Sequence, residues 1–491
     1  MTSSTQPLTD TVPIPSQPLL TALRGALHRA KELGEGILVY QNLSIESRDL
    51  LPMVAVSGSE QFRCYWEKPD EGFSLACTGA VVSLDFNAQE KRLEVIHKME
   101  RVLAQGVDCS SSPQQNSRPR LLAGFAFDLD GAADRNTSTS PGPWGAFPRG
   151  RLVLPECLAT RRDERTVLTV SCIIQPWDDV EAIAQDMEAS AAAAQRKLSA
   201  TSPENGQSRC VEREELPGRE AWMNRVAQAK AQFGPQLSKV VLARTLRLEF
   251  DAPISIEQVL SRLRVRYPEC FTFMFDLPGS GTFVGATPER LLRIDDDVIY
   301  TEALAGTISR GVAPGDDQAQ GKALLKDPKE QSEHAYVAEF IRKRLEPITS
   351  ELKIPSEPTL FYSKDVIHLR TPISARLNLS ISGLELASRL HPTPAVAGTP
   401  TQNATEAILN SEGVDRGWYA GVLGWMDGQG TGDFVVGLRS ALIRGRSAYL
   451  FAGGGIVAGS IPEKEWEETR LKFQAMLQAL CGSAESPGRD Y

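Results

Sequence analysis

Two kinds of hydrophobic pattern alternate along this chain. Some segments are continuous or alternating apolar runs, which are typical of strands, and others carry the apolar spacing of amphipathic helices. Beyond about residue 218, strands and hairpins alternate with helices to the end, and no repeat of solenoid length is present. This order predicts a mixed or antiparallel sheet with helices packed on its faces. The predicted strands include residues 151–154, 166–174 and 239–250, and the predicted helices include residues 178–199, 219–233 and 255–266.

Segments rich in Ser, Pro, Gly and Asn interrupt this pattern and predict loops. They cover residues 106–118, 133–145 and 200–218, and the last is the strongest candidate for a domain boundary. At roughly 100 to 200 residues per domain, the 491 residues allow about three domains or one unusually large one. Residues 1–20 lack the basic and apolar regions of a secretory signal, so we expect a flexible tail there.

Composition and charge exclude several classes of protein. The chain is 41% hydrophobic and 23% charged, and no apolar run approaches the roughly 18 to 20 residues that cross a bilayer as a helix. A net charge of -9 argues against bulk nucleic-acid binding, so an anionic substrate has to meet positive charge that is local. The 8 cysteines form no CxxC pair, which speaks against a zinc site or a disulfide framework. We therefore expect reduced cysteines in a cytoplasmic protein.

Residues 327–348 predict a helix that carries two glutamates near its start. Asp327 is expected as the N-cap, and Glu330, three residues later, has the position that completes a capping box. Glu333 heads an apolar stripe that continues through Val337, so its carboxylate needs a partner. That partner is either a metal ion or, at a helix end, plain solvent.

A second predicted helix, residues 460–480, has a similar start. Ser460 has the spacing of a capping-box N-cap, and Glu465, Glu468 and Lys472 follow on one stripe. On its own this stripe is typical of a solvated Glu/Lys face. Two helices that each present an ExxE pair, however, would suit a hard cation such as Mg²⁺ if the four carboxylates converge.

Three single residues combine a charge with an apolar or turn context. Arg439 falls within residues 433–443, where both faces are apolar and a buried strand is predicted, so it needs a structural ion pair or a ligand carboxylate. Lys239 starts an apolar strand, and this pattern alone favours an exposed lysine; a buried lysine there would need a lowered pKa to act as a base. Glu289 follows Ala-Thr-Pro at a strand-to-turn junction, pointing either into a cleft or into water.

Nine motifs follow one another from about residue 239 to residue 480. They are KVVLAR, GATPERLL, LAGTISRG, HLRTPISARL, LHPTPAV, DRGWYAGVLGW, FVVGLRSAL, AGGGIV and EWEET. In this order they resemble the chorismate-utilising enzymes of menaquinone, siderophore and tryptophan synthesis, and within that family the isochorismate synthases.

The resemblance implies one large α+β fold, the chorismate-utilising enzyme fold. Two large, mostly antiparallel sheets would form a sandwich with helices outside, so the loop near residue 210 would be internal. Residues 21–215 would then form the N-terminal part of the fold, and residues 216–482 would form the catalytic region that binds chorismate. Monomers are common in this family, and we expect one here.

The resemblance also implies a bound Mg²⁺ that neutralises the ring carboxylate of chorismate. Glu333 and Glu468 would be its principal ligands, with Glu330 and Glu465 close by or acting through water. The implied substrate contacts are Gly306, Thr307, His368, Ala395, Tyr419, Arg439, Gly453, Gly455 and Lys472.

The nucleophile separates the branches of this family. A lysine at position 239 together with the small Ala305 resembles the water-using branch, so no glutaminase partner is expected. In that branch Lys239 would take a proton from the water that attacks ring C2, and Glu289 would protonate the departing C4 hydroxyl. Glu289 must then be protonated when substrate binds, and we expect a raised pKa in a dry site.

The product is the last question that the sequence addresses. Ala395 lies where salicylate synthases tend to carry Thr, which favours a reaction that stops at isochorismate. Against this, Tyr419 is shared with salicylate synthases, and Glu330 stands where several isochorismate synthases have Asp. Salicylate synthase is therefore the alternative, and the product would feed menaquinone, siderophore or salicylate synthesis.

Overall fold

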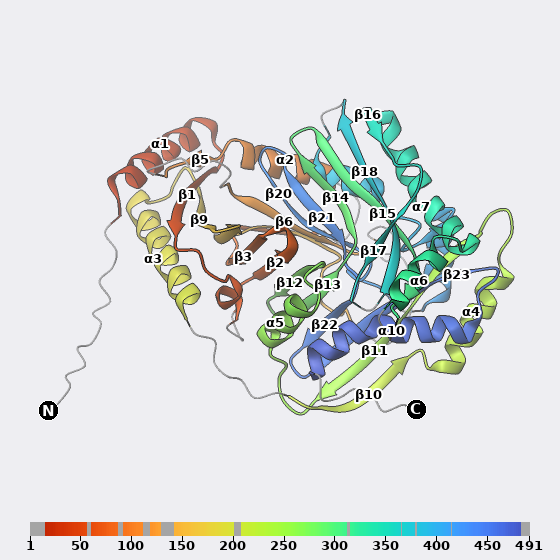
Figure 1. Cartoon of the computed structure of the whole chain (residues 1–491). Coiled ribbons are helices and arrows are strands. Elements are labelled where there is room, and N and C mark those ends of the chain that lie inside the picture. Colours follow the sequence, from red (N-terminus) through yellow and green to blue (C-terminus); the bar gives the residue numbers. More distant parts are fainter. Residues whose placement is uncertain are drawn as a thin grey trace.

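The described chain consists of two large β-sheets with helices around them, as the computed structural model shows (Figure 1). Among the residues described, the paired strands are antiparallel with one exception, the parallel pair of β1 (Ile37–Ile45) and β5 (Val107–Asp108). The structure describes residues 15–55, 60–86, 92–110, 118–128, 142–200, 208–311, 315–364, 366–378, 381–413 and 415–482.

The larger sheet has 13 strands in the described part of the chain, and both halves of the sequence supply them. Neighbours in the following order are hydrogen-bonded, and β19 (Gly398–Thr399) pairs with β11 outside that order. The strands are β10 (Cys210–Leu216), β11 (Lys239–Phe250), β23 (Ser447–Val457), β22 (Ser440–Arg444), β13 (Gly281–Thr287), β12 (Phe271–Leu277), β2 (Arg63–Lys68), β3 (Phe73–Thr78), β8 (Cys157–Arg162), β9 (Arg165–Ile174), β1 (Ile37–Ile45) and β5 (Val107–Asp108).

The smaller sheet has 10 strands by the same description and also mixes both halves of the sequence. Strand β17 (Thr359–Tyr362) pairs with β18 outside the main order. The strands in order are β16 (Thr349–Lys353), β18 (Val366–Leu377), β15 (Val298–Ser309), β14 (Arg290–Asp295), β21 (Gly432–Val436), β20 (Val422–Asp427), β6 (Arg120–Phe125), β7 (Gly150–Leu154) and β4 (Val82–Phe86).

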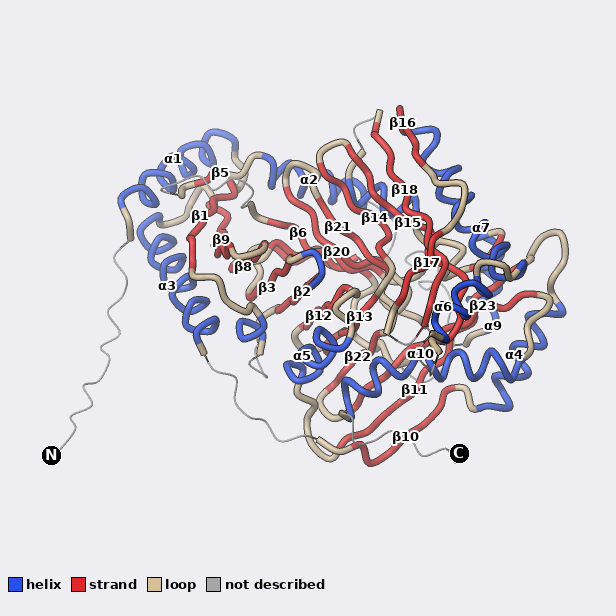
Figure 2. The backbone as a smooth tube through the Cα atoms, in the orientation of Figure 1, coloured by secondary structure: helices blue, strands red, loops and turns tan. Residues whose placement is uncertain are grey.

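Helices cover the outer faces of both sheets (Figure 2). Helices α1, α3, α5 and α10 pack on the 13-stranded sheet, α7 and α8 pack on the 10-stranded sheet, and α2 contacts one strand of each. None of the helices in the described residues is long and apolar enough to span a membrane. The helices are α1 (Gln17–Leu33), α2 (Arg92–Ala104), α3 (Val180–Ser199), α4 (Arg219–Ala231), α5 (Ile256–Arg266), α6 (Asp316–Leu324), α7 (Pro328–Leu345), α8 (Gly383–Leu390), α9 (Thr401–Ser411) and α10 (Pro462–Cys481), with 3₁₀ turns at Leu51–Val54, Pro69–Glu71 and Glu346–Ile348.

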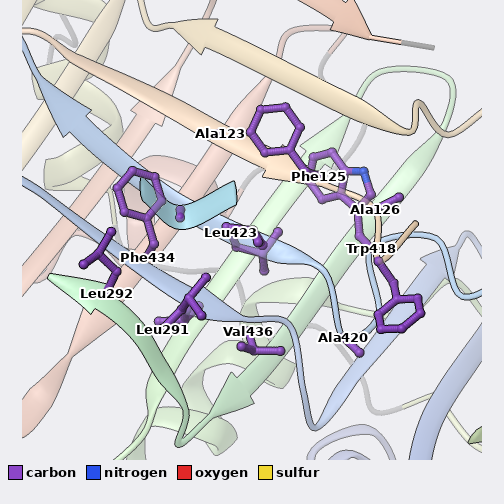
Figure 3. Packing of buried hydrophobic residues seen from close by; sticks show 14 of the residues in the cluster. Ala123, Phe125, Ala126, Leu291, Leu292, Trp418, Ala420, Leu423, Phe434 and Val436 are labelled. Atoms are coloured by element: carbon purple, nitrogen blue, oxygen red, sulfur yellow. The ribbon is translucent and has the colours of Figure 1, made fainter. Parts of the chain in front are cut away.

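The main core lies between the two sheets and is rich in aromatic rings. Phe73 of the larger sheet stacks on Trp425 of the smaller one, with ring centroids 5.3 Å apart. Trp418 contacts Phe275 edge-on at 5.5 Å. Figure 3 shows Phe434 beside its cross-strand partner Leu292 on the other face of the smaller sheet, where Phe434 packs against Gly383 of α8. The sandwich with outer helices, expected from the family resemblance, is confirmed.

The elements predicted from apolar periodicity are confirmed to within about two residues. Strand β11 spans the residues predicted for it, and the two earlier strands each begin one residue sooner. The helix predicted from residue 178 begins after its N-cap, Asp179, whose side chain accepts from two backbone N–H groups. The pattern succeeds here because a helix such as α3 buries one face in a core, while β11 is a continuous apolar run that is buried along most of its length.

Two predicted irregular regions are partly regular. Cys210–Leu216, inside the predicted loop at residues 200–218, forms the edge strand β10 against β11. Its sequence is polar, as is common for edge strands, which often carry charged residues. It therefore lacks the apolar alternation from which strands were predicted. The predicted tail over residues 1–20 also ends early, since α1 begins at Gln17 and Leu19 is fully buried. Residues 1–14, 111–117, 133–141 and 201–207 of the predicted tail and loops lie outside the described residues.

One predicted capping box is only half formed. Asp327 caps α7 by accepting from the backbone N–H groups of Lys329 and Glu330, as expected. The Glu330 carboxylate does not turn back to the cap, however, because its Oε2 accepts from the backbone N–H of Thr307 at 2.9 Å. The glutamate thus joins α7 to a strand of the smaller sheet.

The second predicted capping box is absent, and that prediction is wrong. Helix α10 begins at Pro462, and its N-cap is Ile461, which makes no side-chain hydrogen bond in the described structure. Ser460 lies one residue too early to cap the helix, and its hydroxyl accepts from the N–H of Val457 instead. Proline at the start of a helix leaves one fewer N–H to satisfy, which reduces the need for a cap.

The strand predicted over residues 433–443 is also wrong, because the chain changes sheets within it. Strand β21 ends at Val436 in the smaller sheet, and β22 begins at Ser440 in the larger one. Arg439 lies in the connection with a positive φ of 44°. Both ends of this segment are buried and apolar, so its hydrophobic pattern looks like that of one continuous strand.

We expect the substitution Phe434→Ala to destabilise the sandwich strongly. The ring is fully buried and packs against Gly383 at the start of helix α8, and removing such a side chain costs about 3 to 5 kcal/mol through lost burial and a residual cavity. Thermal unfolding should show a clearly lower Tm. Trp177→Ala is the matched control because Trp177 is 80% exposed, so its Tm should stay near that of the unchanged protein.

Candidate active site

Two connections between the sheets place two charged side chains in the same region. Glu289 lies between β13 of the larger sheet and β14 of the smaller one, and Arg439 lies between β21 and β22. The connections are hydrogen-bonded to strands beside them: the N–H of Val436 donates to the carbonyl of Glu289, and the N–H of Ala286 donates to the carbonyl of Arg439, both at 3.1 Å. Each residue therefore has its backbone fixed where the sheets meet.

A cavity of about 150 Å³ opens at this place, between strands β11, β15, β18 and β23 and helices α7 and α10. It brings together most of the residues predicted for the site. Lys239 and Glu465 are the two predicted residues that lie behind its wall. The predicted residues that line it are Glu289, Gly306, Thr307, Glu330, Glu333, His368, Ala395, Tyr419, Arg439, Gly453, Gly455, Glu468 and Lys472.

Lys239 is buried, with 1% of its surface exposed, so the exposed lysine that the strand pattern alone favoured is wrong. Its Nζ donates to Glu333 Oε1 at 2.7 Å. Burial acts to raise the pKa of Glu333, but the charge of Lys239 outweighs burial and holds that pKa below its ordinary value. Gly455 makes this approach possible, because a Cβ there would lie 3.1 Å from Lys239 Cε and 3.2 Å from Glu333 Oε1.

Glu289 is a buried carboxyl whose pKa is strongly raised. Burial raises its pKa to about 8, and the nearby charge of Glu302 adds to the rise. At neutral pH the group is therefore mostly protonated and can donate a proton. This confirms the raised pKa expected from the sequence.

The four glutamates of α7 and α10 approach one another in pairs. Burial and then the charge of Glu333 raise the pKa of Glu330. Burial and then the charge of Glu468 raise the pKa of Glu465 to about 7. Glu468 in turn accepts from Lys472 Nζ at 2.7 Å. Negative charge is thus concentrated on one side of the cavity and only partly balanced by lysines.

This donor set fits a hard cation in chemistry, although the side chains do not stand as a formed metal site. Within the described residues, no group of three or more His, Cys, Asp or Glu side chains is close enough to hold a metal ion. Glu465 Oε2 is nevertheless buried without a hydrogen-bond partner in the described structure. A buried carboxylate oxygen in this state favours a cation, and carboxylate oxygens are the ligands that Mg²⁺ uses.

The opposite side of the cavity carries donors that suit an anionic group. Arg439 Nη2 lies 3.5 Å from His368 Nε2, and His368 Nδ1 lies 2.9 Å from the hydroxyl of Thr307. Burial lowers the pKa of His368 to about 3, with Arg439 and then Lys472 adding to the effect, so the imidazole is neutral. Gly306 permits the β-bulge before Thr307, since its φ of 78° is left-handed and strained for other residues.

Lys472 and Tyr419 complete the part of the wall next to β23. Lys472 Nζ also donates to the carbonyl of Gly453 at 2.8 Å. Burial acts to lower the pKa of Lys472, but the charge of Glu468 outweighs it, so the lysine stays protonated. The ring of Tyr419 stacks on Phe451 at 5.4 Å. Lys472 and Arg439 therefore supply the local positive charge that an acidic protein needs to bind an anion.

Sequence reasoning missed Arg416, which lines the cavity and is almost fully buried. Its guanidinium pairs with Glu412 and donates to the carbonyls of Val241 and Val396. The ion pair therefore ties the end of α9 to β11 and to the segment that contains Ala395. Both residues lie beyond the last residue of α9, Ser411, so no helical spacing marked the pair in the sequence.

Comparison with known proteins gives these features a family. The sequence model of the family described as chorismate binding enzyme matches residues 25–481. The chain is 36% identical over 466 residues to the isochorismate synthase MenF of Bacillus subtilis (strain 168), which covers 93% of this chain and 96% of that protein. It is also 36% identical over 477 residues to the salicylate biosynthesis isochorismate synthase of Pseudomonas aeruginosa, covering 95% and 96% respectively.

A solved structure agrees over nearly the whole chain. MenF, the menaquinone-specific isochorismate synthase from Escherichia coli, superposes with a TM-score of 0.74 at 26% identity, covering 94% of this chain and 100% of that one. The family model spans both halves of the sequence, as do both sheets. With its two-sheet sandwich and its charged cavity between the sheets, the chain belongs to the chorismate-binding enzyme family.

Proposed function

We propose that this protein is an isochorismate synthase, an isomerase that converts chorismate to isochorismate. The observation that carries the proposal is that a buried carboxyl of raised pKa, Glu289, lines the cavity, while a buried lysine, Lys239, lies directly behind its wall and contacts the lining residue Glu333. Water enters at ring C2 and the C4 hydroxyl leaves as water, so the overall reaction is an isomerisation. Two relatives that cover this chain almost fully carry the same activity in their names.

Lys239 is the general base in this proposal. It takes a proton from the attacking water, while Glu289 gives its proton to the C4 hydroxyl so that this oxygen leaves as water. The carboxyl of Glu289 must start protonated, and Lys239, which is ion-paired with Glu333 in the structure, must lose its proton before it can act as a base. The pKa of about 8 supports the required state of Glu289.

Substrate carboxylates bind to the positively charged wall. Arg439 offers a planar fork that pairs with a carboxylate, and Lys472 contributes a second positive charge. Gly306, Thr307 and His368 supply neighbouring polar contacts on β15 and β18. The remaining contacts are Ala395, Tyr419, Gly453 and Gly455.

Glu333 and Glu468 are the proposed principal ligands of Mg²⁺, with Glu330 and Glu465 beside them. When bound, the ion supplies positive charge that neutralises the ring carboxylate of chorismate. The chain's own part is to hold four carboxylates on two facing helices, α7 and α10. Lys239 and Lys472 balance two of these carboxylates in the structure.

The same proposal covers partners, location and organisation. Water as the nucleophile requires no ammonia and hence no glutaminase partner, and we propose a cytoplasmic monomer. Residues 216–482 form the catalytic region, because the predicted site residues all belong to it. Residues 21–215 form the remainder of the same fold.

Incubation with chorismate and Mg²⁺ tests the function directly. Chromatography should resolve isochorismate as the main product, without added ammonia. Lys239→Ala should lower kcat by about 10²- to 10⁴-fold, the usual contribution of a general base. Salicylate with pyruvate as the main product would show a lyase instead, and unchanged turnover by Lys239→Ala would remove the lysine from the mechanism.

Activity should fall as the pH rises through about 8. The pKa of Glu289 is raised, so its protonated, active form persists below that pH and is lost above it. We expect kcat/KM to fall about tenfold per pH unit on the alkaline limb. Calorimetry provides the control: an ionised Glu289 repels the dianion, so chorismate binding to the unchanged protein should weaken with pH. Chorismate binding to Glu289→Gln should not weaken in this way, because glutamine does not ionise. An identical pH dependence of binding in both proteins would contradict the role of Glu289 as the acid.

Glu468→Gln should weaken Mg²⁺ binding while leaving the fold intact. Loss of even an outer-shell partner costs about 10- to 100-fold in metal affinity, so loss of a ligand should cost at least that much. Glu467→Gln is the matched control, since this neighbour on the same helix is exposed and pairs with Arg470. Calorimetric titration with Mg²⁺ measures the difference, and turnover in excess EDTA would show that no metal is needed.

A further inference from the structure

Arg439 is held from behind by a chain of hydrogen bonds that leads away from the cavity. Its Nη1 donates to Ser363 Oγ at 3.0 Å, and Ser363 Oγ donates to Glu269 Oε1 at 2.9 Å. A guanidinium has no acceptor atom, so the Ser363 hydroxyl has to accept from it. The hydroxyl proton must therefore point to Glu269, and the order of donors is fixed.

Neither Ser363 nor Glu269 lines the cavity. Ser363 is 1% exposed and lies in the tight turn between β17 and β18, where its own N–H donates to the carbonyl of Val366. Glu269 lies just before β12, on the other sheet. The carboxylate thus bridges the two sheets without any access to substrate.

The carboxylate at the end of this chain is itself anchored. Glu269 Oε1 also accepts from the N–H of Lys364 at 3.1 Å, and the Glu269 carbonyl accepts from Lys68 Nζ at 2.7 Å. Ser363 is fixed as well, since its carbonyl accepts from Arg310 at 2.9 Å. Both members therefore have backbone positions that do not depend on Arg439.

We infer that Ser363 and Glu269 are positioning residues that orient the guanidinium of Arg439 for a substrate carboxylate. An arginine side chain has many rotamers, and immobilising such a chain on binding costs affinity. The Ser363 hydroxyl removes this cost in advance by holding Nη1, and the Glu269 charge polarises the hydroxyl toward accepting. The guanidinium of Arg439 is then already oriented for a carboxylate before the ligand binds. This inference rests on the proposed function, because it assumes that Arg439 binds a carboxylate of chorismate.

The first test is the kinetics of Ser363→Ala. The loss of one hydrogen bond to a charged group should raise KM for chorismate about tenfold. Because the contact acts on the bound substrate throughout, kcat should stay within about twofold. Ser363→Thr keeps the hydroxyl and should restore KM. An unchanged KM in Ser363→Ala, or no restoration by Ser363→Thr, would overturn the inference.

A matched control separates positioning from general stability. Ser447 also donates its hydroxyl to a carboxylate, Glu249, at 2.6 Å, but it is remote from Arg439 and outside the cavity lining. Ser447→Ala should leave KM unchanged. An equal rise of KM in both variants would mean that the effect of Ser363→Ala is structural.

A double-mutant cycle tests whether Ser363 acts through Arg439. Arg439→Ala should raise KM by more than Ser363→Ala does, and the double variant should resemble Arg439→Ala alone, because the group that Ser363 orients is already gone. Independent, multiplying effects of the two substitutions would contradict the inference.

Crystal structures without ligand give a readout that does not depend on the reaction. In Ser363→Ala the guanidinium of Arg439 should be displaced or disordered, whereas in Ser447→Ala it should keep its place. An unmoved, ordered guanidinium in Ser363→Ala would refute the positioning role. If the unchanged protein did not convert chorismate, the proposed function would be refuted. The positioning role would still be tested, because the crystal structures show the position of Arg439 without any reaction.

Discussion

The structure depends on two short connections that carry the chain from one sheet to the other. At both connections the backbone is held by a strand of the sandwich, through the hydrogen bonds of Val436 to Glu289 and of Ala286 to Arg439. Polar backbone cannot remain unpaired between two apolar sheets, so these bonds are a condition for crossing there at all. Once they form, an acid and a cation project into one cavity at fixed positions, and the neighbouring strands and helices supply its walls.

Charge balance is the second constraint, and it shapes everything around that cavity. Isolated ions are costly to bury, so the lysines are paired with glutamates: Lys239 with Glu333, and Lys472 with Glu468. Glu289 has no such close cation and instead carries a raised pKa. One buried carboxyl therefore stays ionised and another stays protonated, although they share a cavity. The difference comes from their partners, not from their residue type.

Most of the secondary structure was predictable because apolar patterns are local in the sequence. The family was predictable because its motifs follow one another in a fixed order. Helix α3 buries one regular face, and strand β11 is an apolar run that is buried along most of its length. The two wrong predictions both come from relying on the hydrophobic pattern. Arg439 was assigned to a continuous strand because burial at both ends conceals a change of sheet. The polar edge strand β10 was assigned to a loop because an exposed edge needs no apolar face.

The sequence by itself determined the residue types of the site, through the ordered motifs from KVVLAR to EWEET, and it determined the apolar faces that pack the sandwich. Only the tertiary structure decided what those residues do to one another. Lys239 could be exposed or buried until β11, β23 and α7 were placed together, and Ser363 gave no signal until its turn met Glu269 from the other sheet. The reason is physical: a pKa shift or a hydrogen-bond direction arises from burial and from partners far away in the sequence, and no local pattern encodes them.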